Sequence, residues 1–145
     1  MAIKDGFSSK EWQTLEFSPF WVLGAMGTAD GKLEEKEVEA FKKELADAPF
    51  YKDELVREVM LAIVMSLADV MAAYKADPRK VQEGLSDLAN VLEKKSPEHA
   101  EAFKKVMLSI AVKVAGAEGK GKDHISQEEK VAFALLASMM RAKLD

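Results

Sequence analysis

Cysteine is absent from this chain of 145 residues, and proline and glycine are scarce. Without cysteine the chain has no disulfide, no thiolate metal site, no iron–sulfur cluster and no cysteine nucleophile. Only four prolines and eight glycines interrupt the sequence, and no stretch sustains the apolar–polar alternation of a strand. Alanine, leucine, methionine, glutamate and lysine, which favour helix, fill most of the rest. We therefore predict an all-α protein.

Excess positive charge is missing as well. The chain has 25 acidic and 21 basic residues, a net charge of −4 and an isoelectric point near 5.3, which argues against binding to nucleic acid or an anionic membrane. The first ten residues lack the apolar region of a signal peptide. The most apolar stretch, Met60–Tyr74, is shorter than a membrane span. We expect a cytoplasmic protein with no nucleic-acid partner and no direct membrane insertion.

Helix caps and apolar spacing predict a single compact bundle of about seven helices, forming one domain over residues 1–145. The stretch over residues 59–71 is apolar almost all round, so we expect the helix that holds it to be central and buried. The predicted helices cover Ser9–Glu16, Pro19–Ala29, Glu34 to just before Pro49, about Lys52–Lys75, a fifth from Asp77-Pro78, Ser96-Pro97 to Ala117, and a last one from Ser126.

An internal repeat is the most informative feature. In each copy an apolar helix ends in alanine, an acid and glycine; an aliphatic residue follows, and four positions later comes a glutamate just inside the next helix. The first copy has Ala29-Asp30-Gly31, Leu33 and Glu37, and the second has Ala117-Glu118-Gly119, Ile125 and Glu129. These helix–loop–helix units span about residues 19–46 and 97–144. A pseudo-twofold arrangement of them would bring the four carboxylates together.

These residues resemble the TerB-like family, which is named for a tellurite-resistance protein and also occurs in the N-terminal region of certain membrane-anchored DnaJ-type co-chaperones. The resemblance covers the chain from about Pro19 to its end. It implies an all-helical fold and a place in stress-response or membrane-associated complexes. It also implies that the clustered acidic residues bind a divalent metal. Glu118 departs from the family's usual aspartate, and residues 120–123 lengthen the second loop.

The candidate metal ligands are Asp30, Glu37, Glu118 and Glu129, with Asp123 and His124 as additions. Carboxylates suit a hard cation such as calcium, magnesium or manganese. A structural alternative stays open, because negative charge in a first helical turn favours the helix dipole and Glu129 fits a capping box with Ser126. Residues 29–39 hold five acids and two bases, and residues 117–129 hold four acids and two bases. These two segments therefore carry the chain's excess negative charge.

Other candidates have simpler interpretations. Asp69 interrupts the most apolar helix and either faces Lys113 or reaches the surface. His99 lies in a first helical turn and suggests no site. The methionines, among them Met60, Met65, Met71, Met107, Met139 and Met140, are expected in the core. The aromatic cluster of Trp12, Phe17, Phe20 and Trp21 is expected to cover one end of the bundle, with a partner-docking patch as the alternative.

No constellation supports catalysis, so we expect a non-enzyme. The leading hypothesis is a TerB-like binding module in a cytoplasmic stress-response or membrane-associated assembly. Its acidic surface would contact a protein partner through Glu34, Glu35, Asp123 and Glu128 and would hold a divalent cation. The alternative is a helical carrier or enzyme that holds an apolar ligand in a methionine-lined cavity between the fourth and sixth helices.

Overall fold

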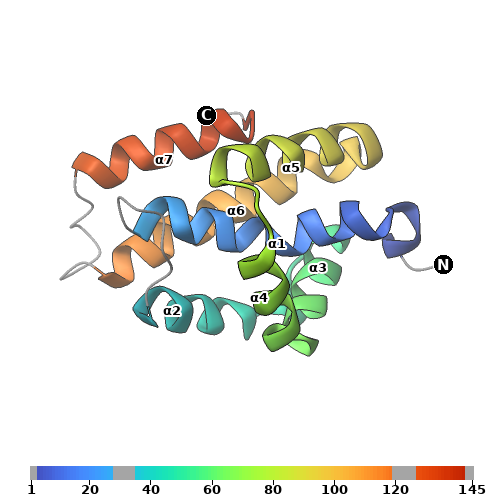
Figure 1. Ribbon diagram of the computed structural model, residues 1–145, viewed down its shortest axis with the longest axis horizontal. Helices are drawn as coiled ribbons and strands as arrows, with labels where there is room; N and C mark the ends of the chain where they lie inside the picture. The colour runs from blue at the N-terminus through green and yellow to red at the C-terminus, as the bar shows by residue number, and fades with distance from the viewer. Residues whose placement is uncertain (1–2, 28–34, 119–126, 143–145) are drawn as a thin grey trace.

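A computed structural model describes residues 3–27, 35–118 and 127–142 of the protein (Figure 1). Over those residues the chain forms seven α-helices, two short 3-10 helices and no strand, which confirms the all-α prediction. In chain order the elements are η1 (Ile3–Gly6), α1 (Ser9–Gly27), α2 (Glu35–Leu45), η2 (Ala48–Phe50), α3 (Glu54–Met65), α4 (Leu67–Ala76), α5 (Val81–Lys95), α6 (Pro97–Glu118) and α7 (Gln127–Met139).

Helix α1 is the centre of the bundle and contacts α2, α3, α4, α5, α6 and α7. The prediction of two helices here is wrong, because α1 continues through Pro19. Proline has no amide hydrogen to bond the carbonyl four residues earlier, which belongs to Leu15. The Ser18 hydroxyl donates to that carbonyl oxygen at 2.6 Å instead. A side chain thus replaces the missing backbone hydrogen bond, and the helix survives.

The predicted single helix over Lys52–Lys75 is also wrong. It breaks at Ser66, whose backbone leaves the helical region with φ −138° and ψ 37°. Beyond the break, α4 turns back so that Tyr74 packs against Phe17 and Phe20 of α1. The prediction that this stretch forms a central, buried helix is wrong at the break, since Val64 is 44% exposed and Met65 is 83% exposed. Because one predicted pair of helices merges and one helix divides, the total of seven is unchanged.

Helix α5 starts later than predicted. Asp77 and Pro78 belong to the extended connection between α4 and α5, which crosses α1 (Figure 1), and the helix begins at Val81. Leu85, Leu88 and Leu92 are fully buried, as their three- and four-residue spacing predicts. Each such side chain contributes about 2 kcal/mol by leaving water.

The aromatic cluster of α1 lies in the core. Trp12, Phe17, Phe20 and Trp21 are all at most 4% exposed, so they form no docking patch. Phe20 also meets Phe41 of α2 edge to face, with 5.3 Å between ring centroids. These contacts fix α2 and α4 onto the same stretch of α1. None of the described helices is both long enough and apolar enough to cross a membrane.

Candidate functional site

The two helix–loop–helix units meet at one end of the bundle, which we call the acidic end. There α1 and α6 finish and α2 and α7 begin, at the left of Figure 1. Helix α6 packs against α1, α2 and α7, so both units share it as a neighbour. The ends of four helices are therefore grouped where the repeat places its acids.

The predicted ligands lie in or beside these helix ends. Glu37 and Glu129 belong to the first turns of α2 and α7, and Glu118 is the last residue of α6. The side chains of these three residues, and of Glu35 and Glu128, lie outside the described part of the structure. The remaining predicted residues, Asp30, Glu34, Asp123 and His124, lie outside the described residues altogether. Among the side chains that are described, no three acids or histidines are arranged to hold a metal ion.

Two acids of α2, one near its middle and one near its C-terminal end, are engaged in ion pairs. Glu39 of α2 pairs with Lys42 at 3.3 Å on the surface, and Glu44 pairs with Lys113 of α6 at 3.3 Å. Lys113 therefore does not face Asp69, which is exposed on α4. Of the two positions considered for Asp69, the surface position is the correct one.

His99 does more than its sequence position indicates. Its Nδ1 lies 2.7 Å from Oδ1 of Asp53, while the other carboxylate oxygen of Asp53 accepts a hydrogen bond from the Val56 amide at the start of α3. The pair joins the first turn of α6 to the N-terminal cap of α3. The role of His99 is therefore structural, since it links the start of α6 to the start of α3.

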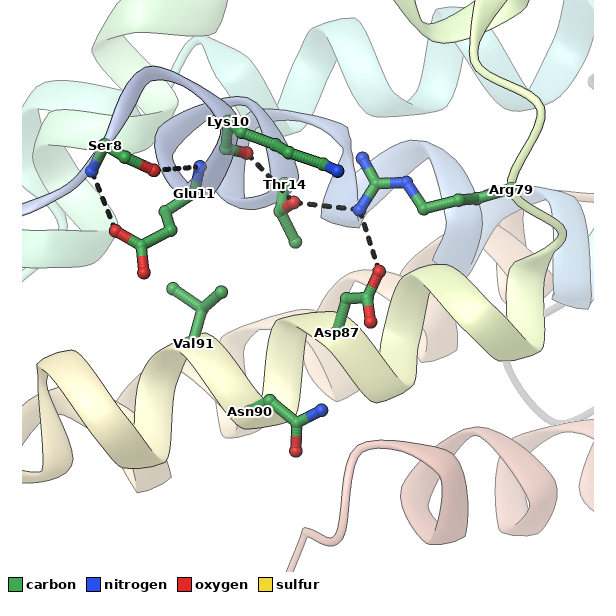
Figure 2. Close-up of a pocket in the computed structure, with 8 residues that line it drawn as sticks. All are labelled: Ser8, Lys10, Glu11, Thr14, Arg79, Asp87, Asn90 and Val91. Carbon is green, nitrogen blue, oxygen red and sulfur yellow. Dashed lines mark hydrogen bonds and ion pairs between the residues drawn. The ribbon is translucent and has the colours of Figure 1, made fainter.

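An open cleft of about 280 Å³, which no sequence motif indicates, lies between α1 and α5 (Figure 2). Helix α1 and the residue before it supply one wall, α5 supplies the other, and Arg79 closes one end. The lining residues are Ser8, Lys10, Glu11, Thr14, Arg79, Asp87, Asn90 and Val91. On α5, the positions 87, 90 and 91 share one helix face because they are three and four residues apart.

Arg79 organises that end of the cleft. Its Nε and Nη2 donate to the two oxygens of Asp77, each at 3.0 Å, and its Nη1 donates to Thr14 Oγ1 at 2.9 Å and to Asp87 Oδ2 at 3.1 Å. Four of the five guanidinium hydrogens are thereby used. The hydrogen bonds from Arg79 lower the pKa of Asp77 below its ordinary value, because they favour the ionised carboxylate.

Trp21 supports Arg79 from beneath. The guanidinium carbon lies 4.8 Å from the centroid of the indole, a geometry that favours a cation over an aromatic face. The indole also lies against Gly84 on α5, where a Cβ atom would lie 2.2 Å from Trp21 Cε2. Glycine therefore permits the close approach of α5 to α1. We call Arg79, Asp77, Asp87, Thr14 and Trp21 the Arg79 cluster.

At the opposite end of the cleft, Ser8 and Glu11 form a capping box. The Ser8 amide donates to Glu11 Oε1 at 2.8 Å, and the Glu11 amide donates to the Ser8 hydroxyl at 3.1 Å. These bonds satisfy amide groups at the start of α1 that have no helical partner. The hydrogen bond from the Ser8 amide lowers the pKa of Glu11. Both side chains thus cap the start of α1.

A second cluster joins the end of α7 to α5 and α6. Arg141 donates from Nε and Nη2 to the two oxygens of Glu93, at 3.1 and 3.2 Å, and from Nη2 to Asn90 Oδ1 at 2.7 Å. The Lys104 ammonium, 2% exposed, donates to the same Glu93 carboxylate at 3.1 Å and to the Arg141 carbonyl oxygen at 3.3 Å. The hydrogen bonds from Arg141 and Lys104 lower the pKa of Glu93. We call Arg141, Glu93, Lys104 and Asn90 the Arg141 cluster.

The methionines divide between core and surface. Met60 and Met107 are fully buried and Met140 is buried as well, as expected, whereas the prediction for Met65 is wrong because it ends α3 on the surface. The Met107 sulfur lies 3.5 Å from the Ser18 hydroxyl oxygen, whose hydrogen is donated to Leu15. The hypothesis of an apolar ligand between α3, the first part of the predicted fourth helix, and α6 stays a prediction.

Comparison with known proteins gives one informative likeness. The chain is 28% identical, over 141 aligned residues, to a protein of Methanothermobacter thermautotrophicus named "Uncharacterized protein ORF11'", and the alignment covers 94% of this chain and 90% of that protein. No protein-family model matches the chain, and no solved structure does. The likeness thus extends over nearly the full length of both chains, and the name of the relative states no activity.

Proposed function

We propose that this protein is a non-catalytic, TerB-like binding module that works through protein contacts in a stress-response or membrane-associated assembly. Its acidic end is the working surface and binds a divalent cation. The observation that supports this proposal is the grouping of the α1, α2, α6 and α7 ends (Figure 1). A site that uses one acid before and one after each loop requires the two loops to leave the bundle at the same end.

The chemistry of the proposed site follows from its residue types. Carboxylate oxygens are preferred by calcium, magnesium and manganese over softer metals. Asp30 and Glu37 would come from the first unit, and Glu118 and Glu129 from the second. Several carboxylates held close together repel one another, and a divalent cation relieves that repulsion. Cation binding would therefore stabilise the acidic end. It would also hold the outer acids in place to contact a protein partner, and these acids are Glu34, Glu35, Asp123 and Glu128.

Calorimetric titration with calcium, magnesium and manganese tests the cation site. We expect saturable binding to the wild-type chain at millimolar concentration or below, and none to the double variant Asp30→Ala/Glu118→Ala. The matched control is Asp69→Ala/Glu83→Ala, which removes two exposed acids from α4 and α5. It changes net charge equally and should bind as the wild type does.

The outcomes separate the site from general acidity. If none of the three cations binds the wild type at millimolar concentration, the cation proposal is wrong. Equal loss of binding in the control variant would also overturn it, since the effect would then come from net charge. Circular dichroism of both variants verifies that the helices remain, because neither pair of acids belongs to the described core.

A further inference from the structure

We propose that the cleft between α1 and α5 is a second binding site, and that it accepts a small zwitterion of the α-amino-acid class. The cleft is separate from the acidic end and does not depend on the function proposed above. The cleft is lined mostly by exposed and partly exposed residues of two helix faces, and Val91 of α5 supplies its apolar surface (Figure 2).

Three lining side chains retain polar atoms that the fold does not use. The Lys10 ammonium extends toward Arg79 without an ion pair to any described residue (Figure 2). Asn90 accepts from Arg141 through Oδ1, which leaves its amide hydrogens without an acceptor in the described part of the chain. Asp87 accepts from Arg79 through Oδ2, and its Oδ1 has no donor among the described residues. Unused donors and an unused acceptor thus line one cleft.

The charges of the lining select the class of ligand. Lys10 and Arg79 are cations, and Glu11 and Asp87 are carboxylates, so the formal charges cancel. A simple anion would meet two carboxylates, and a simple cation would meet two positive groups. A zwitterion satisfies both signs. Its carboxylate fits the Lys10 ammonium and the Asn90 amide, while its ammonium fits Asp87 Oδ1 through charge-assisted hydrogen bonds.

The remaining groups explain why Arg79 is not the main anchor. Two carboxylates, Asp77 and Asp87, already pair directly with Arg79, whereas the Lys10 ammonium acts on Asp77 only at longer range and makes no direct ion pair among the described residues. Lys10 is exposed and has a long, mobile stem, so it can adjust to a ligand. Val91, half-buried on α5, offers the aliphatic surface on which an apolar ligand side chain would lie.

The experiment is calorimetric titration of the full chain with L-leucine as the probe. Two analogues are titrated alongside: leucinamide, which lacks the carboxylate, and 4-methylpentanoate, which lacks the ammonium. We expect saturable millimolar binding of leucine and roughly tenfold weaker binding of each analogue, because a site that pairs a polar group rejects a ligand without it. Absence of saturable binding at roughly 10 mM leucine overturns the proposal.

Variants assign the binding to the cleft. Lys10→Gln should weaken leucine binding about tenfold with little change in the melting temperature, since the Lys10 ammonium makes no direct ion pair among the described residues and acts on Asp77 only at longer range. Lys105→Gln, on the exposed face of α6, is the matched control and should bind as the wild type does. Asp87→Asn keeps an oxygen for Arg79 and should weaken binding of the ligand ammonium. Equal affinity of Lys10→Gln and Lys105→Gln, or of leucine and leucinamide, contradicts the assignment.

Discussion

The Arg79 and Arg141 clusters use the same chemistry at different depths. In each, an arginine donates two hydrogen bonds to one carboxylate. Arg141 thereby joins the end of α7 to α5, whereas Arg79 pairs with Asp77 inside the α4–α5 connection and reaches α5 and α1 through Asp87 and Thr14. The side chains of Arg79 and Asp77 are 12% and 13% exposed, whereas those of Arg141 and Glu93 are 44% and 45% exposed. We therefore expect burial, rather than hydrogen-bond geometry, to decide how much each bidentate pair contributes to stability.

The physical reason is solvation. Removing one partner of a buried pair leaves an uncompensated charge away from water, which is strongly destabilising. At the surface, water and salt replace the lost partner, and the same removal has little effect. Trp21 increases the difference, because it shields one face of the Arg79 guanidinium. The following predictions test this contrast.

The largest effect is expected for Arg79→Ala. It leaves Asp77 without its bidentate partner and Asp87 without its ion pair, so the free energy of unfolding should fall by about 3 kcal/mol. Chemical denaturation measures the change. Arg79→Lys, which keeps the charge but loses the planar pair of donors, should lie between this variant and the wild type. A loss below about 1 kcal/mol for Arg79→Ala would show that burial does not decide the comparison.

Gly84→Ala should be the next most harmful change. The added Cβ would meet the rigid indole of Trp21, and relieving that overlap means moving α5 or the ring on which Arg79 stacks. We expect a loss of about 2 kcal/mol and a shifted tryptophan fluorescence spectrum. Gly6→Ala is the control, since nothing lies within 4 Å of a Cβ atom there. If the two alanine variants are equally stable, the close contact is not a constraint.

Arg141→Ala should cost only about 0.5 to 1 kcal/mol. Lys104 remains as a partner for Glu93, and water reaches the rest of the carboxylate. The difference from the wild type should shrink in high salt, because exposed charges are screened. A loss as large as that of Arg79→Ala, independent of salt, would reverse the comparison.

Acid titration gives the smallest effect. Arginine hydrogen bonds lower the pKa values of both Asp77 and Glu93 in the folded state. Their stabilisation is therefore complete above the ordinary carboxyl pKa near 4 and is lost as the pH falls through the lowered values. Asp77→Asn and Glu93→Gln should each flatten the dependence of stability on pH in that acidic range. Unfolding curves that keep the wild-type slope would show that these carboxylates do not drive acid destabilisation.

Helices were predictable where a local pattern determined them. The leucine stripe of α5 and the start of α6 at Pro97 need only periodicity and a first-turn proline. Local pattern predicted the wrong outcome at Pro19, where the helix continues, and at Ser66, where it ends. A hydroxyl one residue before the proline rescued α1, while Ser66 ended a run of good helix formers so that α4 could cover α1.

The candidate sites divide in the same way. The acidic end could be proposed from sequence because its residues repeat with matching spacing on either side of two turns. The Arg79 cluster could not be proposed in this way, since Thr14, Asp77 and Asp87 share no motif. The Arg79–Thr14 hydrogen bond joins residues that are 65 positions apart in the sequence. Among the residues that line the cleft, the Ser8–Glu11 capping box has a recognisable sequence pattern, a serine followed three positions later by a glutamate.

The sequence by itself determined an all-helical chain without thiol chemistry, the inward faces of its amphipathic helices, and the location of its excess negative charge. These properties depend on composition and on neighbours within two helical turns. Tertiary structure decided that α4 folds back over α1 and that Trp21 lies between Arg79 and Gly84. Such outcomes depend on which apolar surfaces, distant in sequence, lower the free energy most when they are buried against each other. The local spacing of residues does not specify that pairing.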